Sequence, residues 1–352
     1  MSDALRTAAS RPATLEDVAR VAGVSRSTVS RVINGIRNVD SDIQESVRLA
    51  IAATGYVPNS AARSLVTRRA GSIALILSGV TEEIEDEERA RNRVLTDPFF
   101  GRALSGVIGA LRPFGLHPLL MVADTVEARD QVVGHLKQGG ADGAILVSTD
   151  ADDPLPARLV EVGLPAVLFA RPVHPIPISY VDLANRDGAR LAADHLAARG
   201  CRQVAVIGGP TGVPAAEDRL TGFREAMARH GCPYVPCVEG DFTQRGGEAA
   251  MERLLAQQPD LDGVFAANDL MAQGAMLALR EHGRRIPEDV AVIGFDDSSA
   301  ALAGRPQLTT VRQPVEAMAA ELTRLLLARV EDPSRAVTSV IFEPTLIVRQ
   351  SA

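Results

Sequence analysis

The stretch LEDVARVAGVSRSTVSRVINGIRNV, residues 15–39, predicts two short helices joined by a glycine-containing turn. In the first, residues 15–22, apolar side chains recur at positions i, i+3, i+4 and i+7 and so share one face. Thr14 is a candidate N-cap, and Gly23 permits the left-handed turn that ends the helix. A second helix follows, capped by Ser25. This layout is typical of a helix-turn-helix, whose second helix enters the major groove of DNA.

The second helix, which ends near Ile33, presents polar side chains suited to nucleic acid on one side. Arginine suits the edge of guanine, and serine or threonine suits phosphates and several bases. These residues are Arg26, Ser27, Thr28, Ser30 and Arg31. A third helix is expected from about Asp40 to Gly55. The alternative interpretation is a small three-helix bundle whose arginines are merely solvated.

Charge is distributed unevenly along the chain. The net charge is −7, which alone would argue against nucleic acid. Residues 1–69, however, carry ten arginines and six acidic residues, a net charge of +4, so the remainder carries −11. A basic head on an acidic body is expected when only one end of a protein meets DNA.

Length and composition narrow the class of protein. The 352 residues predict two or three domains, and a hydrophobic fraction of 46% favours folded cores over disorder. Neither a secretory segment nor an apolar run of about 18 residues is evident, so we expect a cytoplasmic protein without a membrane span. Cys201, Cys232 and Cys237 lack CxxC spacing. They fit a reducing compartment, and neither a metal site nor a cofactor is expected.

From Ser72 onward, apolar strand-like runs alternate with amphipathic helical patterns. The expected strands are residues 73–77, 119–122, 144–147, 166–169, 204–207, 264–267 and 290–295. The expected helices include residues 102–112, 189–199, 219–230, 247–257 and 271–282. Such alternation predicts parallel sheets covered by helices on both faces. Because roughly 280 residues exceed what one core usually takes, we expect two doubly wound α/β lobes.

The chain resembles the lactose-repressor (LacI/GalR) family of regulators over essentially its whole length. The resemblance is carried by the helix-turn-helix stretch and by four later segments. These are YVPNSAARSL (56–65), GFDD (294–297), LTTVRQP (308–314) and PTLIVR (344–349).

The resemblance implies three parts. They are a helix-turn-helix domain (12–57), a hinge helix and linker (58–71), and an effector-binding and dimerisation domain (72–352) similar to periplasmic sugar-binding proteins. Lobe 1 would comprise residues 72–182 and 313–340, and lobe 2 residues 183–312 and 341–352. Three crossovers near Asp182, Gln313 and Val340 would connect them.

The family's DNA contacts can be placed on this sequence. Arg26 and Ser27 match specificity positions, Arg31 matches a base-contacting arginine, and Leu65 matches a leucine that wedges into the minor groove. The full set is Ser25, Arg26, Ser27, Thr28, Ser30, Arg31, Asn34, Asn59, Ala62 and Leu65. An ordinary core leucine is the alternative for Leu65. Ile43 replaces a threonine that is common in the family near a phosphate. Paired recognition helices imply a homodimer on a near-palindromic operator in double-stranded DNA.

Several polar residues follow strand-like runs, and ligands bind at the carboxyl ends of strands in such sheets. Arg, Asn and Asp supply the donors and acceptors that sugar hydroxyls need. By resemblance, the candidate effector-binding residues are Asp97, Phe99, Phe100, Arg171, Arg219, Asn268 and Asp296. The implied effector is a mono- or oligosaccharide.

Each candidate has an alternative role. Phe99 and Phe100 could pack at a helix start, Arg219 could form a salt bridge between the lobes, and Asp296 could cap the next helix. Arg171 stands where some relatives carry an acidic residue, which leaves the identity of the effector open.

We therefore expect a transcriptional repressor of carbohydrate genes, without catalytic residues. One alternative is the sugar-binding protein of a transporter, which has no use for residues 14–67. The other is a sugar-metabolising enzyme with a DNA-binding head. The sequence contains no GxSxG or HExxH motif, and the loop Gly208–Gly212 lacks a P-loop lysine.

Overall fold

The computed structural model describes residues 13–33, 39–56, 69–78, 97–148, 150 and 152–352. The chain divides into two compact units, residues 1–71 and 72–352, and each is described here by itself. Among the described residues, none of the helices is long and apolar enough to cross a membrane.

The first unit contains three helices: α1 (Leu15–Ala22), α2 (Arg26–Ile33) and α3 (Ser41–Thr54). Thr14 and Asp17 form a capping box at the start of α1, and Gly23 ends it with φ 66°. One small core joins the helices; its buried members are Val18, Ala19, Val29, Val47 and Ala50. The expected three-helix arrangement is confirmed because the apolar spacing and the caps point to the same boundaries.

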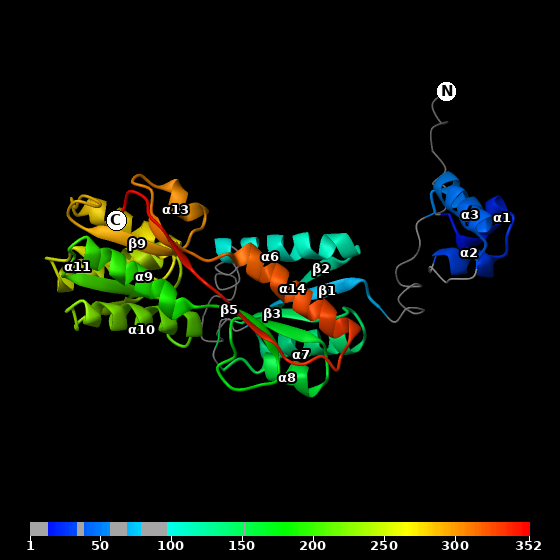
Figure 1. The fold of residues 1–352 in the computed structure, drawn as a ribbon, viewed down its shortest axis with the longest axis horizontal. Coiled ribbons are helices and arrows are strands. Elements are labelled where there is room, and N and C mark those ends of the chain that lie inside the picture. The colour runs from blue at the N-terminus through cyan, green and yellow to red at the C-terminus, as the bar shows by residue number, and fades with distance from the viewer. Residues whose placement is uncertain (1–12, 34–38, 57–68, 79–96, 149, 151) are drawn as a thin grey trace, which may run out of the picture. The chain divides into compact units, whose positions relative to one another are not determined.

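Lobe 1 of the second unit is built on a parallel six-stranded sheet with the order β11-β5-β4-β3-β1-β2 (Figure 1). Its strands are β1 (Ser72–Ser78), β2 (His117–Ala123), β3 (Ala144–Ser148), β4 (Ala166–Phe169), β5 (Ser179–Leu183) and β11 (Ser339–Phe342). Its helices are α6 (Pro98–Leu111), α7 (Val126–Lys137), α8 (Leu155–Glu161) and α14 (Val315–Glu331), with a 3-10 turn η1 (Arg112–Phe114) after α6.

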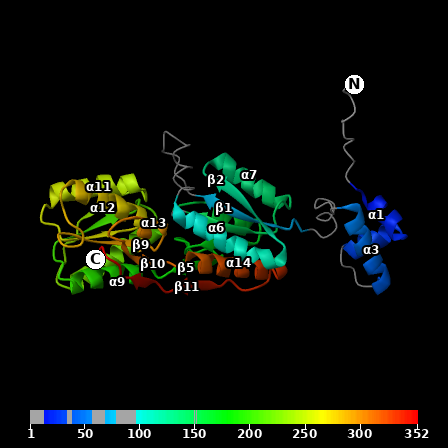
Figure 2. The same ribbon diagram turned by 90° about the horizontal axis from the view of Figure 1, so that it is seen from above.

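Lobe 2 repeats this plan with the strand order β12-β10-β9-β8-β6-β7, in which only β12 is antiparallel to its neighbour. Its strands are β6 (Val204–Gly208), β7 (Cys237–Glu239), β8 (Gly263–Ala266), β9 (Ala291–Asp296), β10 (Thr309–Arg312) and β12 (Thr345–Ile347). Its helices are α9 (Asn185–Ala198), α10 (Pro214–Arg229), α11 (Gln244–Gln257), α12 (Asp269–Glu281) and α13 (Ser299–Ala303). Figure 2 shows α11 and α12 on one face of the sheet and α9 on the other.

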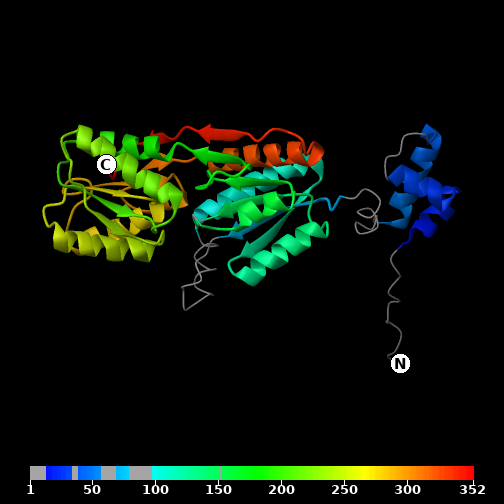
Figure 3. The same cartoon turned by 90° about the horizontal axis from the view of Figure 1, so that it is seen from below.

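The chain passes between the lobes three times. It leaves lobe 1 after β5, returns at Gln313 and Pro314, and crosses last at Glu343 and Pro344, where the red segment of Figure 3 runs from one lobe to the other. The last crossing lies beyond the expected Val340, because that residue is in the middle of β11 and pairs with β5. The resemblance gives this crossing only to within a few residues, and pairing with β5 extends the lobe 1 strand to Phe342.

Helices α6 and α14 of lobe 1 approach each other closely at Gly106. A Cβ atom added at Gly106 would lie 2.5 Å from the Glu316 carbonyl oxygen and 2.8 Å from the Ala319 Cβ, whereas one added at Gly109 would meet nothing within 4 Å. The two glycines lie in the same helix, so they separate the effect of packing from that of helix propensity.

We expect Gly106→Ala to lower the free energy of unfolding by about 1–3 kcal/mol, because the α14 backbone must move. Gly109→Ala should leave it unchanged or raise it by up to about 1 kcal/mol, since alanine favours the helix. Urea unfolding followed by circular dichroism measures both. Equal effects of the two substitutions would contradict the packing argument.

Candidate functional site

A cavity of about 140 Å³, the first compartment, lies where the two lobes meet. Six of the seven predicted effector residues line it: Asp97, Phe99, Phe100, Arg219, Asn268 and Asp296. The other lining residues are Val147, Ser148, Phe169, Ala170, Asp182, Asn185, Val213, Ala215, Phe242 and Gln313. Arg171 is outside this set and lines an adjoining cavity instead. The structure therefore brings together residues that are up to 216 positions apart in the chain.

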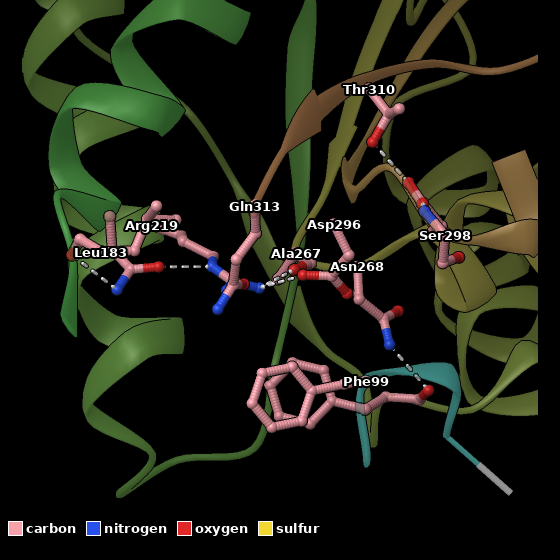
Figure 4. A network of polar contacts seen from close by, with 12 residues as sticks. Phe99, Leu183, Arg219, Ala267, Asn268, Asp296, Ser298, Thr310 and Gln313 are labelled. Atoms are coloured by element: carbon pink, nitrogen blue, oxygen red, sulfur yellow. Dashed lines mark hydrogen bonds and ion pairs between the residues drawn. The ribbon is translucent and has the colours of Figure 1, made fainter. Parts of the chain in front are cut away.

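Arg219, on α10, donates one hydrogen bond from each of its three guanidinium nitrogens, which leaves N–H groups for a ligand (Figure 4). Its Nε donates to Asn185 Oδ1 at 2.9 Å, Nη1 donates to the Ala267 carbonyl at 2.6 Å, and Nη2 donates to Gln313 Oε1 at 3.2 Å. Nη1 also lies 3.6 Å from Asp296 Oδ1. Both members of that ion pair belong to lobe 2, so among the described residues the contacts contradict the alternative of a salt bridge between the lobes.

Packing and charge also constrain Arg219. Its guanidinium carbon lies 3.7 Å from the centre of the Phe295 ring, which gives a cation–π contact. Burial lowers the pKa of Arg219, and the neighbouring carboxylates, led by Asp296, oppose that effect. A guanidinium that is buried, oriented and charged is suited to donate hydrogen bonds to a ligand oxygen.

Asp296 ends β9 in a left-handed conformation with φ 106°, which is unusual for a residue other than glycine. Burial raises the pKa of this carboxyl well above its ordinary value, against the effect of Arg219. The expected alternative, that Asp296 caps the following helix, is wrong, because the Ser298 side chain caps α13. Asp297 does not cap it either; it pairs with Arg312 at 2.7 Å.

Two candidate residues are themselves helix caps. Asn268 Oδ1 accepts from the Met271 N–H at 2.9 Å, and its Nδ2 donates to the Phe242 carbonyl at 2.9 Å. Asp97 Oδ1 accepts from the Phe99 N–H at 2.9 Å. Burial raises the pKa of Asp97. The caps fix both side chains at helix starts that line the cavity, with lone pairs remaining for a ligand.

Aromatic rings form one wall of the cavity. Phe99 packs edge-to-face on Phe100, with ring centres 5.3 Å apart, and on Phe169 at 5.1 Å. Phe99 and Phe100 lie at the start of α6 and pack against the core, as the alternative interpretation predicts. Both also line the cavity, so the two interpretations are compatible.

Arg171 follows β4 in lobe 1 and forms an ion pair with Asp218 of α10, in lobe 2, at 2.6 Å. A second carboxylate, Asp182, lies 3.8 Å from it. These interactions raise the pKa of Arg171, chiefly through the hydrogen bond to Asp218. Arg171 is thus a link between the lobes, next to the first compartment.

Arg102, on α6, is a second link between the lobes, and the sequence analysis did not identify it. Its Nη1 donates to the Asp296 carbonyl at 2.8 Å, and its Nη2 donates to the Gln313 carbonyl at 2.9 Å. The Glu316 carboxylate accepts from its Nε at 2.7 Å. Nothing in the local sequence distinguishes Arg102 from an arginine on the outer face of a helix.

Other lining residues could have been found by the rule that ligands bind at strand ends. Asp182 lies near the end of β5, Asn185 follows that strand, and Gln313 follows β10. Neither strand was predicted, because polar residues interrupt the apolar run in SYVDL and in TTVR. Ser148 ends β3 and Ala170 follows β4, and both strands were predicted. These two small residues were not predicted to contact a ligand.

The polar side of α2 has the composition expected for DNA recognition. Ser25 accepts from the Thr28 N–H at 3.1 Å and caps the helix. Arg26 is exposed and lies 3.0 Å from Glu16, and Ser27 and Arg31 are exposed too. Ser30 is half-buried. Four predicted contact residues lie outside the described residues: Asn34, Asn59, Ala62 and Leu65.

A helix-turn-helix unit and a two-lobed domain with a polar cleft define a DNA-binding regulator with a ligand site. Two family models match the chain: bacterial regulatory proteins, lacI family, over residues 14–59, and a periplasmic binding protein-like domain over residues 193–352. The HTH-type transcriptional regulator CelR of Thermobifida fusca is 42% identical over 346 residues, covering 97% of this chain and 98% of CelR. The chain therefore belongs to the lacI family of bacterial regulatory proteins.

Solved structures agree with this assignment. A complex of CelR with cellobiose has a TM-score of 0.73 and 40% identity, covering 97% of this chain and 100% of that one. The lac repressor dimer bound to operator and the anti-inducer ONPF has a TM-score of 0.81 and 26% identity, covering 97% and 99%. These relatives are transcriptional regulators, which favours the regulator over the transporter component and the enzyme considered from the sequence.

Asp269 is a second buried carboxylate close to the cleft. Its Oδ1 accepts from Thr310 Oγ1 at 2.5 Å, and its Oδ2 accepts from the Ser298 N–H at 2.6 Å. Burial raises its pKa to about 7 from an ordinary value of 3.8. Between these values the folded protein holds a proton that the unfolded chain has released.

This difference makes the Asp269 contribution to stability fall as the pH rises from about 4 to about 7. Asp269→Asn, which keeps the shape without the charge, should remove that contribution. The melting temperature of the variant minus that of the wild type should therefore increase as the pH rises from 5 to 8. Asp289→Asn is the control, because the pKa of Asp289 is lowered to about 2 by Arg285. A constant difference between wild type and Asp269→Asn across this range would contradict the assignment.

Proposed function

We propose that this protein is a homodimeric repressor of carbohydrate uptake and utilisation genes whose operator affinity is controlled by a sugar bound between the lobes. The observation that carries the proposal is the convergence of Arg219, Asp296 and Asp97 with an aromatic wall in one interlobe cavity, on a chain with a helix-turn-helix. The cellobiose-bound structure of CelR supports a sugar as the effector class. The chain is not expected to catalyse a reaction, and it acts in the cytoplasm, at the nucleoid.

The chemistry of the first compartment suits a polyol. Asp97 and Asp296 offer buried acceptors for hydroxyl groups, and the Arg219 guanidinium offers donors to ring or hydroxyl oxygens. Phe99 and Phe100 offer apolar faces to the C–H groups of a sugar ring. A mostly apolar wall with a few convergent polar groups is the usual composition of a small-molecule site.

The two interlobe links explain how such a ligand can alter DNA binding. Arg102 and Arg171 each join lobe 1 to lobe 2, so a ligand in the cleft changes the balance among contacts that set the angle between the lobes. We propose that this angle governs whether the hinge residues 59–66 order on the operator, with Leu65 as the minor-groove wedge. A coupling free energy of about 1–3 kcal/mol is typical of such allostery. The operator-bound lac repressor dimer supports the dimeric arrangement.

The first test concerns DNA. Arg26 and Arg20 are equally exposed arginines of the same unit, on α2 and α1, with side chains 72% and 71% accessible. If Arg26 contacts a guanine edge, Arg26→Ala should weaken binding to an operator selected from random DNA by about 1–3 kcal/mol and relax specificity at one base pair. Arg20→Ala should change the affinity much less. Fluorescence anisotropy measures both, and equal losses would remove Arg26 from the specificity role.

The second test concerns the effector. A thermal-shift screen of full-length protein against neutral sugars, sugar phosphates and nucleobases should give a rise in melting temperature with a sugar, since a ligand at 100 times its Kd adds about 2.7 kcal/mol. The same sugar should change operator affinity without being consumed. A response to nucleobases alone would contradict the proposed sugar effector.

A further inference from the structure

A second cavity, of about 260 Å³, adjoins the first compartment. The two share five lining residues: Ser148, Phe169, Ala170, Val213 and Ala215. We call this cavity the second compartment. It is reached from the first along the ends of β3 and β4 and the start of α10. The shared lining makes one continuous cleft with two parts.

The sizes of the two compartments bear on the length of the ligand. Small-molecule sites typically enclose about 300–1,000 Å³, and the first compartment, at about 140 Å³, falls below that range. With the second compartment, of about 260 Å³, the combined volume of the cleft falls within that range. A ligand confined to the first compartment would leave the larger part of the cleft unused.

The second compartment has its own polar groups for a ligand. The side chain of Asp153 is 1% accessible; its Oδ1 accepts from the Leu155 N–H at 3.0 Å and lies 3.6 Å from Arg129 Nε. Its Oδ2 is buried without a hydrogen-bond partner among the described residues. The Asp153 carboxylate therefore adds buried negative charge to the wall of the second compartment, next to Arg129.

Charge restricts the ligand further. Among the described lining residues, the first compartment has Asp97, Asp182 and Asp296 against Arg219. The second compartment has three carboxylates, Asp150, Asp152 and Asp153. Arg171 and His174 line it as well. Each arginine is already paired with a carboxylate. A phosphate or carboxylate group would therefore be repelled in both parts.

We propose that the effector is a neutral saccharide of at least two rings, with one ring in the first compartment and the next in the second. This inference rests on the proposed function and adds the length and charge of the ligand. The apolar residues Pro154, Pro172 and Ile176 present faces for the second ring, and the carboxylates of Asp150 and Asp152 offer acceptors to its hydroxyl groups.

The second ring also contributes to control. Lobe 1 lines the second compartment through Asp153 and Arg171, and lobe 2 lines it through Val213, Pro214 and Ala215. The ion pair of Arg171 with Asp218 joins the lobes at this place. A two-ring ligand thus contacts both lobes at two separate points, whereas a single ring contacts them at one.

Titration calorimetry on the full-length protein tests the length directly. The probes are glucose, xylose and galactose; the disaccharides cellobiose, maltose, xylobiose and lactose; and glucose 6-phosphate. At least one disaccharide should bind tenfold or more tightly than each of its component sugars, and glucose 6-phosphate should bind no better than glucose. A monosaccharide that binds as tightly as every disaccharide containing it would overturn the proposal but leave the sugar effector standing. Binding of none of these sugars would count against both.

A variant locates the second ring. Ala157, on α8, lines the second compartment but not the first, so Ala157→Phe fills that space. The tightest disaccharide should lose most of its tenfold advantage over its component sugar. Glu161→Phe, on the same helix and exposed, is the control and should keep the advantage. Retention of the full advantage by a folded Ala157→Phe would place the second ring elsewhere. The wild-type comparison stands by itself if this variant fails to fold.

Discussion

The cleft depends on one buried cation, the Arg219 guanidinium. It is the charge that offsets the carboxylates gathered at the ends of the lobe 2 strands, Asp296 first among them. Its hydrogen bonds run to Asn185, Ala267 and Gln313, so one side chain ties together α9, the end of β8 and a lobe crossover. Removing a partner from such a network leaves uncompensated buried charge, typically at a cost of about 3–5 kcal/mol.

Local structure and ligand chemistry use the same side chains in this protein. Asp97 and Asn268 each cap the start of a helix, and the cap fixes the side chain in the lining of the first compartment. The contacts that join the lobes lie beside the same side chains: Arg102 donates to the Asp296 carbonyl, and Arg171 pairs with Asp218. A ligand that contacts the strand ends is therefore never far from a contact that joins the lobes. This proximity gives a physical route from occupancy to operator affinity.

Much of the fold follows from patterns that are local in the chain. The capping residue Thr14, the apolar spacing of residues 15–22 and the turn at Gly23 agree with one another, so the first helix has the predicted bounds. The long helices of lobe 2 and its strands β6, β8 and β9 were predicted because their apolar runs are continuous or regularly spaced. Strands β5 and β11 were not, because polar residues interrupt the first and the second is a half-exposed edge strand that pairs only with β5.

The sequence by itself determined the class of the protein, since the helix-turn-helix, the basic head and the alternation of strands and helices are properties of neighbouring residues. It also identified six of the residues that line the first compartment, because strand ends can be located locally. Only the tertiary structure decided what surrounds them. The contacts of Arg102, the place of Arg171 beside the second compartment and the unpaired oxygen of Asp153 depend on segments far apart in the chain. The physical reason is that side-chain distances, burial and charge balance arise only when the two lobes pack together.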